Sequence, residues 1–313
     1  MRVPVIAIVM GSLSLAAAPA PVSRLSTELT GQVFTYEIQA GDTLTSLGAR
    51  YGAAAAVLAR RNGRSLSKTL VPGELLIVDN RHIVWPAESS IGPVIVINLP
   101  QRMLFHIVHG RVDAYYPVAV GRATWKTPRG PFKIVEKEAD PTWDVPLSIQ
   151  DEMRREGKPV ITSIPPCPAN PLGKYWIRLS HAGVGLHGTN APGSIYGFTT
   201  HGCIRLHPDD VAALFERVSV GDAGVTAYDP VLLARLADGR IFAEVHPDPY
   251  KQGPDPLPYL QTIARSAALT DAIDWTIVAD VVRQREGIAV DVTRPAPATI
   301  TGQSGGLHPS SSR

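Results

Sequence analysis

One segment of about twenty residues, 187–206, contains most of the side chains that could do chemistry. It holds His187 and His201, Arg205, and Cys203, which is one of only two cysteines in the chain. Imidazoles and a permanent cation near a thiol favour the nucleophilic thiolate at neutral pH. The types and spacing of these residues therefore predict that Cys203 is a catalytic nucleophile.

The neighbours of Cys203 have expected roles in acyl transfer, which needs no cofactor. His187 is the expected base or thiolate partner, and a positioned imidazole contributes about 10²–10⁴ in rate. The backbone N–H groups of Gly202 and Cys203 are the expected oxyanion donors, and loss of one typically costs about 2.7–4 kcal/mol. His201 should point to the opposite face of an extended segment, so its role is direct or supporting. Arg205 should return to the Cys203 face, where it grips a substrate carboxylate or braces the loop.

The composition indicates a globular protein of two or three domains. The 313 residues are 44% hydrophobic and 19% charged, with a net charge of +2 and no long basic run. Nucleic acid is therefore excluded as an expected partner. Residues 1–20 begin with one positive charge, continue with an apolar stretch and end in small residues, which resembles a secretory signal peptide. We expect a periplasmic protein; an uncleaved membrane anchor is the alternative.

Export bears on the two cysteines, because disulfides form in oxidising compartments. A bond between Cys167 and Cys203 would remove the nucleophile. We therefore expect Cys167 to be an exposed, unpaired thiol, with a redox switch as the alternative.

After a spacer at 21–33, residues 34–79 predict a small βααβ unit. Alternating apolar residues predict a strand at its start. Asp42 or Thr43 can cap the first helix and Gly52 can end it. The unit resembles a LysM module in Tyr36, Gly41-Asp-Thr-Leu44, Tyr51-Gly52, Asn62 and Pro72-Gly73. The resemblance implies binding of glycans that contain N-acetylglucosamine, and a small cap without a ligand is the alternative.

Residues 93–228, which follow a linker at 80–92, predict a β-rich domain. Apolar or alternating runs predict strands at 94–99, 102–108, 112–120, 132–135, 175–180 and 183–187, and an amphipathic pattern predicts a helix at 209–218. Between these strands, residues 139–174 form a proline-rich excursion with a short helix near 148–157. Long irregular excursions are usually functional, and we expect this one to cover the groove as a lid.

The C-terminal region carries no recognisable chemistry. Residues 229–292 predict a strand at 241–245 and helices at about 257–266 and 270–286. Residues 293–313, dense in Gly, Ser, Thr and Pro, predict a disordered tail.

Residues 93–228 resemble the L,D-transpeptidase catalytic domain of the YkuD type. The strongest parts of the match are His187-Gly-Thr189 and Thr200-His-Gly-Cys-Ile-Arg-Leu206. Supporting parts are Gly121, Thr127-Pro128, Gly130, Pro141-Thr-Trp143 and Asn170-Pro-Leu-Gly173. The fold class expected from the resemblance is mainly β with α, built around a mixed sheet. Thr200 stands where the family often has serine, and it keeps the hydroxyl.

The resemblance also implies a reaction on peptidoglycan stem peptides. Cys203 would attack the bond before a terminal D-alanine, form a thioester and pass the acyl group to an amine. The amine belongs to a second stem, which gives a 3→3 cross-link, to an outer-membrane lipoprotein, or to a free D-amino acid. Residues assigned to substrate binding are Arg205, Thr200, Gly188, Thr189, Tyr196 and Trp143. Core packing is the expected role of Trp176.

Three other functions are compatible with parts of the sequence. A zinc-dependent cell-wall hydrolase could use His187, His201, Cys203 and His207 as ligands, but their spacing is not that of common zinc motifs, so we expect no metal. A papain-like peptidase would place its cysteine before its histidine, which is the reverse of the order here. A non-catalytic peptidoglycan-binding scaffold would need only the LysM unit.

Overall fold

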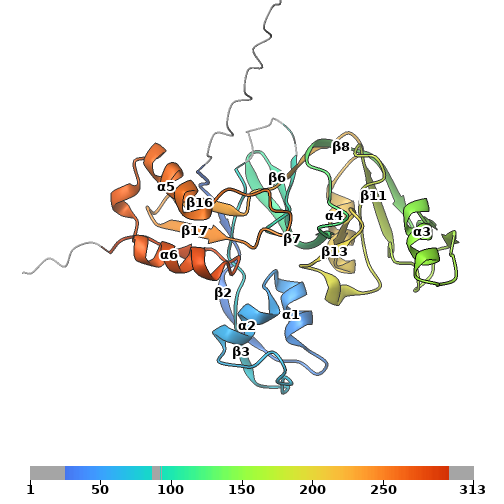
Figure 1. Ribbon diagram of the computed structural model, residues 1–313, viewed down its shortest axis with the longest axis horizontal. Helices are drawn as coiled ribbons and strands as arrows, with labels where there is room; N and C mark the ends of the chain where they lie inside the picture. Colours follow the sequence, from blue (N-terminus) through green and yellow to red (C-terminus); the bar gives the residue numbers. More distant parts are fainter. Residues whose placement is uncertain (1–24, 87–91, 93, 296–313) are drawn as a thin grey trace, which may run out of the picture.

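The computed structural model describes residues 25–86, 92 and 94–295. Figure 1 shows an N-terminal lobe in blue, a large sheet in green to yellow, and a C-terminal lobe in orange and red. The predicted signal peptide (1–20) and most of the predicted tail (293–313) lie outside the described residues. Within the described residues, no helix is both long and apolar enough to cross a membrane.

The N-terminal lobe has the predicted order of strand, helix, helix and strand. Its elements are β2 (Val33–Glu37), α1 (Leu44–Tyr51), α2 (Ala55–Arg61) and β3 (Leu75–Asp79). Thr43 caps α1, because its hydroxyl accepts the Ser46 N–H at 2.9 Å and the Ser46 hydroxyl accepts the Thr43 N–H at 2.9 Å. Gly52 ends the helix with a left-handed φ of 73°. Asp42 instead accepts the Tyr36 hydroxyl at 2.8 Å, which ties the loop to β2.

Nine strands form one mixed sheet that closes on itself. Their order is β13-β7-β14-β12-β11-β8-β15-β5-β6, and β6 pairs again with β7. The strands are β5 (Val94–Asn98), β6 (Met103–Val108), β7 (Arg111–Gly121), β8 (Gly130–Ala139), β11 (Tyr175–Leu179), β12 (Gly185–His187), β13 (Phe198–Thr200), β14 (Ile204–Leu206) and β15 (Ala223–Ala227). Closure depends on the long β7, since residues 111–117 pair with β6 and residues 118–119 with β14. The predicted mainly β fold, preceded by a βααβ unit, is confirmed.

Strand β5 is apolar without alternation because both of its faces are covered. Ile95 and Ile97 belong to the main core of the sheet, which also packs against α4 (Pro208–Arg217). Val96 faces the other way, into a second buried cluster with Phe105 and Tyr196. A continuous apolar run is what a strand buried on both faces requires.

The excursion between β8 and β11 is more regular than predicted. It contains β9 (Trp143–Asp144), α3 (Leu147–Arg155) and β10 (Ser163–Ile164), and β9 pairs with β10. The Asn170 side-chain amide donates to the Pro141 carbonyl at 2.8 Å and so joins the two ends of the excursion. The predicted helix is present, at nearly the predicted position.

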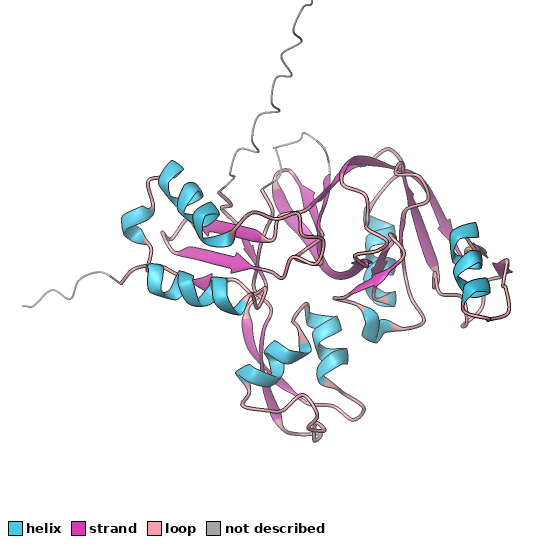
Figure 2. Ribbon diagram, in the orientation of Figure 1, coloured by secondary structure: helices cyan, strands magenta, loops and turns pink. Residues whose placement is uncertain are grey.

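The C-terminal lobe is a small sheet with helices beside it, as Figure 2 shows. It contains β16 (Val231–Arg235), β17 (Ile241–Val245), β18 (Val290–Asp291), α5 (Pro256–Ser266), the 3-10 turn η2 (Thr270–Ala272) and α6 (Trp275–Gln284). The predicted strand and first helix are confirmed. The second predicted helix, 270–286, is longer than the observed α6. The observed helix begins after Asp274, which caps it by accepting the Thr276 N–H at 2.9 Å. Strands β16 and β18 were missed.

The predicted spacer and linker are corrected by the structure, because both take part in sheets. Strand β1 (Leu29–Thr30) pairs with β4 (His82–Ile83). Ser26 exchanges two backbone hydrogen bonds with β16, donating to the Leu233 carbonyl at 3.0 Å and accepting the Arg235 N–H at 2.9 Å. The chain on either side of the N-terminal lobe is therefore fastened to the other lobes.

A buried carboxylate lies where the three lobes meet. Glu244 of β17 accepts hydrogen bonds from His82 Nδ1 at 2.8 Å, His246 Nε2 at 2.7 Å and the Gln101 amide at 3.0 Å. His82 Nε2 also donates to the Gly52 carbonyl at 2.8 Å. Both ring nitrogens of His82 therefore face acceptors, the Glu244 carboxylate and the Gly52 carbonyl. Burial raises the pKa of Glu244, but the positive charge of His82 and the hydrogen bonds from His246 and His82 outweigh it and lower the pKa to about 2.

Candidate active site

Two parallel strands place the candidate catalytic side chains on one face. In the pairing of β12 with β14, Leu186 lies opposite Ile204 and His187 lies opposite Arg205. Leu186 and Ile204 are completely buried in the main core. Alternate residues on a strand point to opposite faces, so His187, Arg205 and the preceding Cys203 share the other face. The apolar pair thus fixes the register that brings the polar residues together.

His187 is held as a neutral base. Its Nδ1–H donates to the Gly188 carbonyl at 2.7 Å, which leaves Nε2 as the nitrogen that can accept a proton. Burial and the nearby positive charge of Arg205 lower its pKa to about 3, against the opposing effect of the Gly188 and Pro171 carbonyls. The imidazole is therefore uncharged at neutral pH in the resting enzyme.

Cys203 is correspondingly a neutral thiol at rest. Burial raises its pKa, although the Gly185 N–H and the Arg205 charge act in the opposite direction. Its Sγ lies 3.6 Å from the Gly183 carbonyl. The expectation of a thiolate already formed at neutral pH therefore does not fit this geometry.

The loop before Cys203 is fixed by one hydroxyl. Thr200 Oγ1 donates to the Cys203 carbonyl at 2.6 Å and accepts the Gly202 N–H at 3.2 Å. Gly202 has a φ of +114°, a conformation that favours glycine. Because Thr200 already holds the Gly202 N–H, the Cys203 N–H is the donor of the expected oxyanion pair that Thr200 leaves available.

Arg205 braces the loop on the other side of the nucleophile. Its Nη1 donates to the Ser194 hydroxyl at 2.9 Å, and Ser194 belongs to the 3-10 turn η1 (Pro192–Ser194). Its Nε is buried and has no hydrogen-bond partner among the described residues. The bracing role is thus observed, and a contact with a substrate carboxylate stays a prediction.

His201 points to the excursion, as expected for a neighbour on the opposite face. Its Nε2 lies 2.6 Å from a Glu152 oxygen and 2.8 Å from Arg122 Nη2. Hydrogen bonds from His201 and Arg122 hold the pKa of Glu152 below its ordinary value. The ring also packs edge-on against Trp125, with ring centres 4.9 Å apart. These contacts join α3 to the loop that precedes Cys203, which no sequence signal indicated.

Gly188 and Thr189 shape the backbone next to His187. A Cβ at Gly188 would lie 3.2 Å from a Val211 methyl and 3.3 Å from the Leu172 carbonyl. The Thr189 side chain is buried and accepts the Ala191 N–H at 2.9 Å. Their observed contacts are with the protein, and a direct substrate contact stays a prediction.

The two aromatic residues predicted to line the donor groove, Trp143 and Tyr196, have different surroundings in the structure. Trp143 is half-buried in β9, where it pairs with Ile164 of the excursion. Tyr196 is only 6% exposed, and its ring stacks with the Arg102 guanidinium at 4.0 Å in a buried cluster. The predicted place of Tyr196 in the groove is therefore corrected, because its side chain packs into the interior.

Trp176, for which lining of the donor groove was the alternative to core packing, lies beside the candidate base. It pairs with His187 across β11 and β12, and the two ring centres are 6.0 Å apart. A Cβ at Gly185 would lie 2.4 Å from the Trp176 ring, so the indole covers that glycine. The available signal was the glycine itself, since a glycine within a strand often marks the close approach of another group.

The four residues of the zinc alternative do not form a ligand group among the described residues. His201 is held by Glu152, and His207 accepts the Asp209 N–H at 3.3 Å at the start of α4. Among the described residues, the group with metal-ligand character is His82, Glu244 and His246. Its donor atoms lie 2.7 and 2.8 Å from one oxygen, whereas ligands on tetrahedral zinc are roughly 3.3 Å apart. That spacing fits hydrogen bonds better than coordination.

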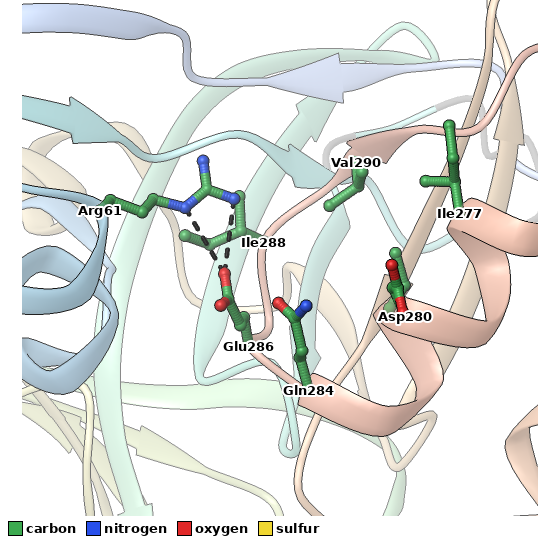
Figure 3. A pocket seen from close by; sticks show the side chains of 8 residues that line it. Arg61, Ile277, Asp280, Gln284, Glu286, Ile288 and Val290 are labelled. Atoms are coloured by element: carbon green, nitrogen blue, oxygen red, sulfur yellow. Dashed lines mark hydrogen bonds and ion pairs between the residues drawn. The ribbon is translucent and has the colours of Figure 1, made fainter.

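Two pockets lie away from the sulfur. One, of about 230 Å³, lies between α2 and α6 and includes the ion pair of Arg61 with Glu286, shown in Figure 3. The other, of about 390 Å³, is lined by Cys167, Lys174, Thr189 and Asn190, next to the loop that follows His187. Both cysteines are free, and Cys167 is exposed, as predicted.

Comparison with known proteins gives consistent matches. Residues 92–232 match the YkuD family, described as the L,D-transpeptidase catalytic domain, and residues 36–79 match the LysM domain. The "Probable L,D-transpeptidase ErfK/SrfK" of Salmonella typhimurium is 28% identical over 88% of this chain and 92% of its own length. YkuD of Bacillus subtilis is 30% identical over 60% of this chain and 96% of its own length. The solved L,D-transpeptidase from Mycobacterium smegmatis aligns with 28% identity and a TM-score of 0.33, over 43% of this chain and 58% of that chain.

Proposed function

This chain belongs to the L,D-transpeptidase family, and we propose that Cys203 is the residue through which it transfers acyl groups between peptidoglycan peptides. The observation that carries the proposal is the shared strand face, on which Cys203, the neutral base His187 and the cation Arg205 lie together. The matching LysM domain indicates the same substrate, since both modules act on the cell wall and imply a protein located outside the cytoplasm.

The first half-reaction forms a thioester. Cys203 Sγ attacks the carbonyl carbon of the stem-peptide bond before the terminal D-alanine, while its proton passes to His187 Nε2. The tetrahedral oxyanion is stabilised by backbone N–H groups, among which the Cys203 N–H is the available donor. The imidazolium then protonates the departing D-alanine nitrogen, so the C–N bond breaks and the acyl group stays on sulfur.

The second half-reaction transfers the acyl group to an amine. A neutral His187 takes the proton from the attacking amine, and the thiolate leaves and recovers that proton. The imidazole is uncharged at neutral pH and so is free to accept a proton. We propose a second stem peptide, giving a 3→3 cross-link, or an outer-membrane lipoprotein as the acceptor. A free D-amino acid would use the same donor step.

The remaining site residues have proposed roles in binding the substrate and in holding the loop at η1. We propose that Arg205 braces η1 and offers its guanidinium to a substrate carboxylate, and that Gly188, Thr189 and Trp143 border the donor peptide. The LysM module would hold the enzyme on glycan, and residues 1–20 would direct export to the periplasm as a cleaved signal peptide.

Intact-protein mass spectrometry tests the acyl-enzyme directly. The protein is mixed with a diaminopimelate-containing tetrapeptide stem, or with a carbapenem, as wild type, Cys203→Ala and Cys167→Ala. We expect an adduct on wild type and on Cys167→Ala, which keeps the proposed nucleophile, and none on Cys203→Ala. An adduct that survives in Cys203→Ala, or is lost in Cys167→Ala, contradicts the assignment.

A further inference from the structure

Residues 121–127 form a loop that lies against the backbone at Thr200 and Gly202, just before Cys203. A Cβ at Gly202 would lie 3.7 Å from the Lys126 carbonyl and 3.9 Å from the Trp125 carbonyl. The Arg122 N–H donates to the Thr200 carbonyl at 3.0 Å. Any shift of this loop would therefore move the backbone that carries Gly202 and the adjacent cysteine N–H.

The two ends of this loop are joined by a residue from outside the catalytic domain. The Tyr250 hydroxyl donates to the Gly121 carbonyl at 2.5 Å and accepts the Thr127 N–H at 3.2 Å. Thr127 Oγ1 also accepts the Gly121 N–H at 2.9 Å. Burial raises the pKa of Tyr250, so the hydroxyl keeps the proton that it donates. Tyr250 lies beyond the segment 92–232 that matches the catalytic family.

The turn that carries Tyr250 is itself rigidly held. The Asp248 carboxylate accepts the Tyr228 hydroxyl at 2.5 Å and the Gly253 N–H at 2.9 Å. The Tyr228 hydroxyl in turn accepts the Tyr250 N–H at 2.9 Å, and the two rings stack with centres 5.0 Å apart. The hydroxyl of Tyr250 is therefore placed before any substrate arrives.

We propose that Tyr250 is a positioning residue for acyl transfer, and that the C-terminal lobe serves the reaction by fixing the 121–127 loop behind the oxyanion site. This inference rests on the proposed acylation of Cys203. It assigns a task to the C-terminal lobe, to which the sequence alone gave none.

Tyr250→Phe separates this role from a general loss of structure. The variant keeps the ring, and so the stacking on Tyr228 and the edge contact with Phe198, but loses the hydroxyl. Two rates are measured: acylation by the tetrapeptide donor and alkylation by iodoacetamide. Alkylation at a saturated carbon forms no oxyanion, whereas acylation does. We expect acylation to fall by about 10- to 100-fold, as for a displaced catalytic group, with alkylation and KM for the donor unchanged.

A matched control is Tyr259→Phe in the same lobe, because the Tyr259 hydroxyl has no hydrogen bond within the part of the chain that the structure describes. That variant should match wild type in both rates. An unchanged acylation rate in Tyr250→Phe overturns the inference. So does an equal fall in both rates, since that would indicate a structural role only.

Two further outcomes are also decisive. If Tyr250→Phe does not fold, Tyr228→Phe replaces it, because it loosens the turn but keeps the Tyr250 hydroxyl. A selective fall in acylation supports the inference, and wild-type rates overturn it. If wild type itself forms no acyl adduct while its thiol alkylates normally, the proposed function fails and the inference fails with it.

Discussion

The buried Glu244 carboxylate should contribute several kcal/mol to stability, and Glu244→Gln tests this. The substitution keeps the shape of the side chain but removes the negative charge that faces His82 Nδ1 and His246 Nε2. It also turns an amide donor toward the N–H groups of His82, His246 or Ile83. Breaking one side of a buried ion pair typically costs about 3–5 kcal/mol.

The pKa of Glu244 gives an independent magnitude and a sign. A carboxyl whose pKa falls from 4.5 to about 2 on folding stabilises the native state by about 3 kcal/mol at neutral pH. Because the folded-state pKa is depressed, this stabilisation is complete above pH 4.5 and is lost as the pH falls toward 2. At pH 3.5 the gap between wild type and Glu244→Gln should therefore be about 1.4 kcal/mol smaller than at pH 7.

Urea unfolding followed by tryptophan fluorescence and circular dichroism measures this gap. The buried His187, whose pKa is lowered, weakens both proteins below pH 6.5 and cancels in the comparison. His246, whose pKa burial lowers, does not cancel, because Glu244 raises that pKa; its further weakening in Glu244→Gln at low pH offsets part of the decrease in the gap. Glu74→Gln is the matched control, since Glu74 is 40% exposed in its ion pair with Arg64 and should cost less than about 1 kcal/mol. A gap below about 1 kcal/mol at pH 7 would refute the reasoning.

Two further predictions concern the nucleophile. Arg205→Gln removes a positive charge that lowers the pKa values of both the Cys203 thiol and the His187 imidazole. The pH midpoint for iodoacetamide alkylation of Cys203 should therefore rise. An unchanged midpoint would show that the charge is screened. Gly185→Ala places a methyl carbon 2.4 Å from the Trp176 ring and must displace the indole beside His187. The rate of acylation by the donor peptide should therefore fall by more than about 10-fold, while the urea midpoint of unfolding drops only modestly. Acylation of Gly185→Ala at the wild-type rate would exclude Trp176 from the site.

Much of the site could be predicted because its chemistry lies within one short segment. Cys203, His187 and Arg205 are close in sequence, and local strand pairing brings them to one face. Residue types alone gave no measure of burial, so they suggested a thiolate where the buried pair is neutral. The groups that arrive from distant segments, Glu152 and Tyr250, had no local signal because their partners are fixed only by the tertiary fold.

The fold followed the sequence best where periodicity and caps agreed. The N-terminal βααβ unit combines alternating residues, a Thr43 cap and a Gly52 stop, and its elements form as predicted. The short strands were missed for a different reason. Strands β1 and β4 have two residues each and find their strand partner only in each other, so no pattern within either segment could indicate them.

The backbone pairing of Ser26 with Leu233 and Arg235 has a consequence for how the molecule is made. These contacts join residues more than 200 positions apart in the sequence. Closing so long a loop is entropically costly and is favoured only once other contacts have formed. During synthesis from the N-terminus, Ser26 has to wait until β16 has emerged before its backbone hydrogen bonds can form. A chain of this topology therefore completes the contacts of its N-terminal segment late.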